Sequence, residues 1–86
     1  MASYEISWKH SAEQELRNID RQFIPRILEA IEALANNPFP SHLRKLHGVE
    51  SSYRIRIGDY RVVYQIDTER ELIVIYHVRH RKDAYR

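Results

Sequence analysis

Apolar and polar side chains alternate every two residues in four short segments of the chain, which is the pattern of a β-strand with one buried face. The first segment covers residues 4–8, with Tyr4, Ile6 and Trp8 on its apolar side. The other three lie close together at residues 53–57, 60–66 and 72–78. In the last of them the apolar side is expected to hold Leu72, Val74, Tyr76 and Val78. Gly58-Asp59 and the polar residues 67–70 separate these three segments and predict tight reversals. We therefore expect an antiparallel meander in the C-terminal half.

Between residues 11 and 35 the apolar residues recur every three or four positions, which is the period of an amphipathic helix. Ser11 is expected to begin the first helix, because Gln14 three residues later completes a capping-box pattern. The second helix ends near residue 35. Pro25 is tolerated only in its first turn, so this helix should start between Arg21 and Gln22 or slightly later. The apolar stripes of the two helices are Ala12, Leu16 and Ile19, then Phe23, Ile24, Ile27, Leu28, Ile31, Leu34 and Ala35.

The order of these elements predicts an α+β fold, β-α-α-β-β-β, in which a helical hairpin packs on one face of a small, largely antiparallel sheet. Eighty-six residues suit one domain, which we place at residues 1–86. The chain has no cysteine, no signal-peptide pattern at its start and no apolar run long enough to span a bilayer. These features favour a cytoplasmic protein that does not bind membranes.

Charge is distributed unevenly along the chain. Residues 1–41 hold four Lys/Arg and six Asp/Glu, whereas residues 42–86 hold ten and six, so net charges of −2 and +4 make up the overall +2. A basic C-terminal half favours a polyanionic partner, nucleic acid first. Ordinary scatter of surface charge is the alternative.

The predicted sheet gathers basic side chains on one face. Arg54 and Arg56 lie two residues apart on one strand, so they point the same way. The short turn that follows should bring Arg61 across from them. Like charges opposite one another destabilise a sheet, so the cluster favours an anionic ligand over a merely solvated face. His77 and Arg79 share a face of the last strand, and Arg81 follows just beyond it, so three more basic side chains join the region.

Two stretches of the C-terminal half, YRIRIGDYRVVY at residues 53–64 and HRKDAY at residues 80–85, carry a family resemblance. Residues 43–86 resemble the RelE branch of the RelE/ParE toxin superfamily of type II toxin–antitoxin systems, and the N-terminal elements match it as a pattern only. The resemblance implies a ribosome-dependent endoribonuclease that cuts mRNA and inhibits translation. In such a reaction the ribose 2′-hydroxyl attacks the adjacent phosphate, and cations stabilise the extra charge. No metal or other cofactor is expected.

The resemblance also assigns roles to residues. Arg61 and Arg81 would hold the scissile phosphate, and Tyr85 would orient the 2′-hydroxyl or stack on a base. Arg54 and Arg56 occupy positions where the best-known members carry lysine. Arginine stays charged, so these two act as electrostatic clamps, and the proton acceptor is left open. Imidazoles could take that role. The candidate bases are His77 and His80. The further candidate RNA-binding residues are Lys45, Arg79 and Lys82.

The expected partners follow from the same resemblance. They are a RelB-like antitoxin, the ribosome with its mRNA, and operator DNA reached only through the antitoxin complex. The histidines lack acidic or cysteine companions at ligand spacing, so no metal site is expected. Two alternatives stay open: a ParE-like inhibitor of DNA gyrase, and a catalytically weak toxin that binds antitoxin and co-represses its operon.

Overall fold

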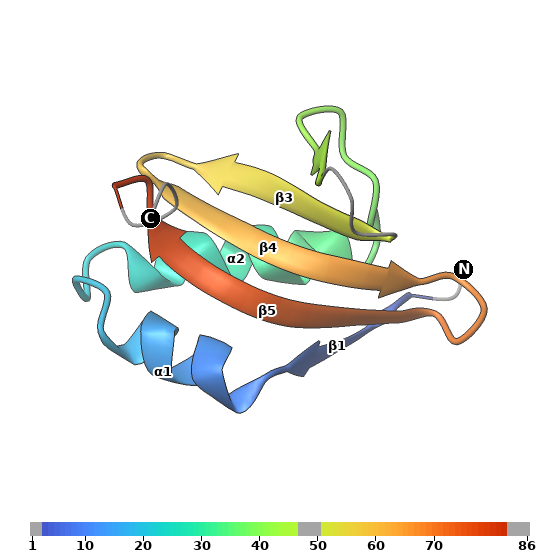
Figure 1. Cartoon of the computed structure of the whole chain (residues 1–86), viewed down its shortest axis with the longest axis horizontal. Coiled ribbons are helices and arrows are strands. Elements are labelled where there is room, and N and C mark those ends of the chain that lie inside the picture. The colour runs from blue at the N-terminus through green and yellow to red at the C-terminus, as the bar shows by residue number, and fades with distance from the viewer. Residues whose placement is uncertain (1–2, 47–50, 83–86) are drawn as a thin grey trace.

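A five-stranded sheet with two helices makes up the fold (Figure 1). The computed structural model describes residues 3–46 and 51–82. The strand order is β1-β5-β4-β3-β2, with β1 parallel to β5 and the other neighbours antiparallel. The expected α+β architecture is confirmed, and β2 is an addition to it. In chain order the elements are β1 (Glu5–Trp8), α1 (His10–Arg17), α2 (Ile24–Leu34), β2 (Arg44–Lys45), β3 (Ser52–Ile57), β4 (Tyr60–Asp67) and β5 (Leu72–His80).

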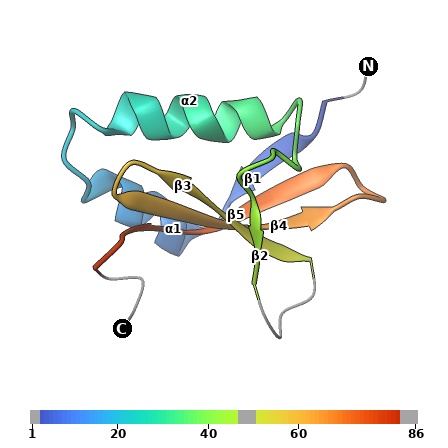
Figure 2. The same ribbon diagram turned by 90° about the horizontal axis from the view of Figure 1, so that it is seen from above.

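The two helices differ in how they begin. α1 starts at His10, and its N-cap residue Lys9 makes no side-chain capping bond, so the capping box predicted at Ser11 is wrong. α2 starts at Ile24 with Pro25 in its first turn, where the missing N–H has no intrahelical partner to lose. In Figure 2, α2 lies along one side of the sheet. Neither helix is long and apolar enough to cross a membrane, nor is any other helix among the described residues.

The hydrophobic core lies between the helices and one face of the sheet. The alternation predicted for β3 and β4 is confirmed, because every second residue of both strands is buried or packs against the core. Phe23 departs from its prediction: it precedes α2 as the N-cap residue and stays 37% exposed. The buried residues are Ala12, Ile19, Ile27, Ile31, Leu34, Ile55, Ile57, Val62, Tyr64, Ile66, Ile73, Ile75 and Val78.

A β-bulge interrupts the pairing of β4 with β5. Val63 pairs with His77, but the next residue, Tyr64, pairs with Ile75, so Tyr76 is an extra residue on β5. An extra residue leaves two side chains of the bulged strand opposite one on its neighbour. The face predicted for residues 72–78 is therefore wrong at Leu72, Val74 and Tyr76, because Ile73 and Ile75 are buried in their place, and right only at Val78.

The bulge decides which side chains of β5 face the core. Ile73 and Val78 are both buried there, although they are five residues apart and strict alternation would place them on opposite faces. Tyr76, expected on the apolar face, lies instead on the outer face, which is the face of the sheet opposite the core. Its hydroxyl donates to Gln65 Oε1 at 3.0 Å, and Lys9 Nζ lies 4.6 Å from its ring centroid.

Candidate nucleic-acid interface

The strand register places basic residues opposite one another on the outer face. Arg56 pairs with Arg61, and Arg61 pairs in turn with Arg79, so three arginines form one row across β3, β4 and β5. Arg54 lies two residues from Arg56 on the same side and pairs with Arg44 of β2. Directly opposed side chains in a sheet have Cβ atoms about 4.5–5.5 Å apart, and like charges at that range are unfavourable. A bound anion would remove that penalty.

Four of these arginines line one open groove of about 850 Å³, which we call the arginine groove. Arg61 is only 8% exposed, so its guanidinium lies deep in the groove, where charges interact more strongly than in bulk water. The groove therefore concentrates positive charge on a concave surface, as a phosphate-binding site requires. Its lining residues are Ser41, His42, Arg44, Arg54, Arg56, Gly58, Asp59 and Arg61.

The loop that carries His42 is fixed against the core by aromatic residues. The Phe39 ring packs edge-on against Tyr53 with centroids 5.7 Å apart. The Tyr64 hydroxyl donates to the carbonyl oxygen of Pro38 at 3.3 Å. Burial raises the pKa of the Tyr64 phenol far above its usual range, and Tyr53 raises it further, so this donor keeps its proton at ordinary pH. These contacts hold the loop at the rim of the groove.

The β3–β4 turn closes one end of the arginine groove. Gly58 has a φ of 59°, a left-handed conformation that glycine adopts without strain. The carbonyl oxygen of Asp59 accepts the backbone N–H of Arg81 at 2.7 Å. This bond ties the chain beyond β5 to the turn. The backbone of Arg81 therefore lies beside the groove, and its side chain is exposed. Lys82 is also exposed, and its N–H donates to His80 Nδ1 at 3.3 Å.

Glu15 of α1 contacts two predicted site residues, the candidate base His77 and the candidate RNA-binding residue Arg79. Its Oε2 accepts the Nε–H of Arg79 at 2.7 Å, and its Oε1 lies 3.2 Å from His77 Nδ1. The same Oε1 accepts the backbone N–H of Val78 at 3.2 Å. β1 pairs with β5 only as far as Trp8. Beyond that point Glu15 supplies the hydrogen-bond acceptor for the backbone N–H at the edge of β5. His77 and Arg79 are thereby held toward α1, and neither lines the arginine groove.

His80 and Lys45 also lie outside the groove lining. His80 pairs with Tyr60 and packs edge-on against its ring at 5.3 Å, on the helix side of the sheet. Lys45 is exposed and pairs with Tyr53, whose ring packs against the core, so Lys45 lies on the other face from Arg44. Tyr85 falls outside the described residues.

Two groove residues were missed by the sequence interpretation. Arg44 belongs to a two-residue strand that shows no period of its own, and only its pairing with Arg54 reveals which way it points. His42 was not singled out among the histidines, and it lines the groove. Within residues 3–46 and 51–82, no three histidine, cysteine, aspartate or glutamate side chains are placed to hold a metal ion.

Comparison with known proteins agrees with this geometry. The family model described as the ParE toxin of the type II toxin–antitoxin system parDE matches residues 6–85. A protein of Methanocaldococcus jannaschii that bears the name toxin RelE1 is 30% identical, over 85% of this chain and 84% of its own. Toxin RelG of Mycobacterium tuberculosis is 27% identical, over 96% and 97% of the two chains.

Solved structures give the same result. The archaeal RelE–RelB complex from Pyrococcus horikoshii OT3 superposes with a TM-score of 0.81 at 27% identity, covering 92% of this chain and 96% of that one. The isolated Escherichia coli RelE toxin shares the fold with a TM-score of 0.80 at 20% identity, over 96% of both chains. The chain therefore belongs to the ParE toxin family of type II toxin–antitoxin systems, in the RelE branch of the superfamily.

Proposed function

We propose that this toxin is a metal-independent endoribonuclease that cuts mRNA on the ribosome and so inhibits translation. The observation that carries the proposal is the arginine groove, in which four guanidiniums converge and Arg61 is almost completely buried. Guanidinium forks match the geometry of phosphate oxygens, and arginine does not lose its charge. RNA is the polyanion that the resemblance to the RelE branch implies.

The reaction needs charge stabilisation and two proton transfers. The ribose 2′-oxygen attacks phosphorus, the bond from phosphorus to the 5′-oxygen breaks, and the products are a 2′,3′-cyclic phosphate and a 5′-hydroxyl. Arg61 and Arg56, adjacent in the register, would hold the non-bridging oxygens as their charge grows. Arg54 and Arg44 would hold the neighbouring backbone. Arg81, beside the turn, stays a predicted phosphate ligand, and Tyr85 stays the residue predicted to orient the 2′-hydroxyl.

His42 is the imidazole that lines the groove, and we assign it to accept the 2′-hydroxyl proton. Imidazole is the side chain best suited to exchange protons near neutral pH. His42→Ala should therefore lower cleavage about a hundredfold. The control is His10→Ala, an exposed histidine on α1. Cleavage that is equal in the two variants would remove His42 from the mechanism.

The proposed partners follow from the relatives. Several solved RelE structures contain RelB antitoxins, so a RelB-like antitoxin is the expected partner of this toxin. An acidic, partly disordered segment would neutralise the arginine groove when it binds. The ribosome and its mRNA are the targets in the cytoplasm, and operator DNA is reached only through the antitoxin complex.

The experiment that tests the function uses purified ribosomes programmed with a defined mRNA. Primer extension should detect breaks within the ribosome-bound region when the toxin is added, and none on the same mRNA without ribosomes. A DNA gyrase supercoiling assay runs in parallel. Intact mRNA on the ribosome together with blocked supercoiling would overturn the proposal in favour of gyrase inhibition. Tight antitoxin binding with neither activity would leave a catalytically weak repressor.

A further inference from the structure

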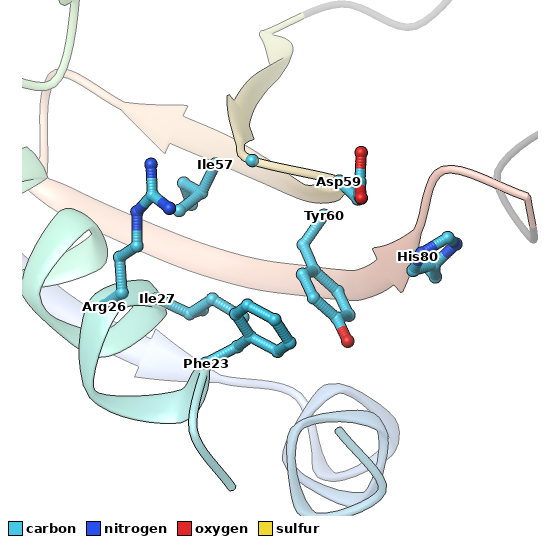
Figure 3. Close-up of a pocket in the computed structure, with 8 residues that line it drawn as sticks. Phe23, Arg26, Ile27, Ile57, Asp59, Tyr60 and His80 are labelled. Atoms are coloured by element: carbon cyan, nitrogen blue, oxygen red, sulfur yellow. The ribbon is translucent and has the colours of Figure 1, made fainter. Parts of the chain in front are cut away.

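A second hollow lies on the helix side of the β3–β4 turn, opposite the arginine groove (Figure 3). It has a volume of about 220 Å³. The Phe23 and Tyr60 rings lie side by side in it with centroids 5.5 Å apart, and His80 stands edge-on to Tyr60. Phe23 is one of two large apolar residues that remain exposed among the described residues, so this ring is available to a ligand.

The hollow adjoins the arginine groove at the β3–β4 turn. Gly58 and Asp59 line both. A third hollow at the end of β3 lies next to both, because it shares Arg26 and Gly58 with the first hollow and His42 and Arg56 with the arginine groove. A Cβ added at Gly58 would be in ordinary van der Waals contact with Arg26 Nη1, at 3.6 Å, so the Arg26 guanidinium lies close to the turn.

Arg26 supplies the charge on this side of the turn. It is exposed, and in Figure 3 it extends from α2 toward the turn. None of the ion pairs among the described residues involves it. A cation next to two aromatic rings is the combination that binds one nucleotide, with the phosphate on the guanidinium and the base on the rings.

We propose that this hollow is a second nucleotide subsite: Phe23 and Tyr60 stack the base of a nucleotide that flanks the scissile phosphate, and Arg26 binds its phosphate. The RNA backbone passes from the arginine groove over Gly58 to reach this subsite. The proposal deepens the proposed function and rests on it, because it requires RNA in the groove. The hollow is smaller than the roughly 300–1,000 Å³ of pockets for drug-sized ligands, which suits a single planar base.

The test measures binding of a short oligoribonucleotide to the full-length toxin without ribosomes, by fluorescence anisotropy over a range of salt concentrations. Phe23→Ala should weaken binding about five- to a hundredfold, and Phe23→Leu should weaken it too, because an aliphatic side chain of similar volume cannot stack. Arg26→Ala should weaken binding and lower the slope of log affinity against log salt by about 0.7. Melting temperatures confirm that each variant is folded.

Matched controls exist for both residues. Leu28→Ala truncates a half-buried apolar side chain of α2 that lines none of the three hollows, and Arg17→Ala removes an exposed arginine from the end of α1. Both should bind the oligonucleotide like the wild type. Equal losses in subsite and control variants, or no binding by the wild type, would overturn the subsite. The subsite would also be overturned if the Phe23 and Arg26 variants bound RNA normally but captured an acidic peptide more weakly, because that result would mark a protein contact. The binding assay requires no cleavage. Failure of the proposed function is therefore detected separately, as the absence of mRNA breaks in the ribosome assay.

Discussion

Arg61→Ala is expected to lower the rate of mRNA cleavage about a hundredfold to a thousandfold, which is the loss seen when one donor to a developing negative charge is removed. Arg61 has Arg56 and Arg79 on either side in the register and is only 8% exposed. A guanidinium in that position stabilises the growing charge on phosphate more than an exposed one, since water screens it less. Primer extension on programmed ribosomes, at several toxin concentrations, measures the rate.

Two further variants make this result specific to the groove. Arg61→Lys keeps the charge and loses the planar fork, so its rate should fall between those of wild type and alanine. Arg70→Ala removes an arginine of the β4–β5 turn whose side chain is 80% exposed and pairs with Asp67 at the end of β4. Its cleavage rate should match the wild type. Similar losses for Arg61→Ala and Arg70→Ala, with both variants folded, would contradict phosphate clamping by Arg61.

Glu15→Ala is expected to lower the free energy of unfolding by about 2–4 kcal/mol. The change removes a charge-assisted bond to Arg79 and leaves the backbone N–H of buried Val78 without its acceptor. It also frees His77 from α1. Because the Glu15 side chain is 26% exposed and that of Arg79 41%, solvent screening limits the ionic part of the loss. Urea unfolding followed by circular dichroism measures the change.

Two neighbouring changes separate the parts of this effect. Glu15→Gln keeps an oxygen that can accept from Val78 and loses the charge, so it should cost less than alanine. Glu13→Ala removes a carboxylate from the first turn of the same helix and should cost under about 1 kcal/mol, its interaction with the helix dipole. If Glu13→Ala and Glu15→Ala were equally destabilising, Glu15 would not be holding the edge of β5.

The sequence predicted the fold well where local pattern decides it. Tyr60, Val62, Tyr64 and Ile66 alternate in the printed order and in space, because β4 itself continues without an inserted residue. β5 shows the limit of this reasoning. The bulge at Tyr76 changes which residues face the core. Apolar residues lie on both sides of it in the sequence, so the sequence pattern does not reveal the bulge.

The candidate site was predictable to a similar degree. Arg54, Arg56 and Arg61 follow from strand parity and a two-residue turn, both of which are local. His42 and Arg44 could not be placed, since contacts such as Phe39 on Tyr53 set the course of their loop. The engagement of Arg79 by Glu15 joins residues 64 positions apart, and no local pattern indicates it.

The central claim is that the arginine groove holds a phosphate for attack by the neighbouring 2′-hydroxyl. Its most direct test is an mRNA that carries a single 2′-deoxynucleotide on the 5′ side of the mapped break, offered to wild-type toxin on ribosomes. The account predicts that the all-ribose mRNA yields 2′,3′-cyclic phosphate and 5′-hydroxyl ends, and that the single substitution abolishes that break. Cleavage through the deoxy position, or products with 5′-phosphate ends, would contradict it.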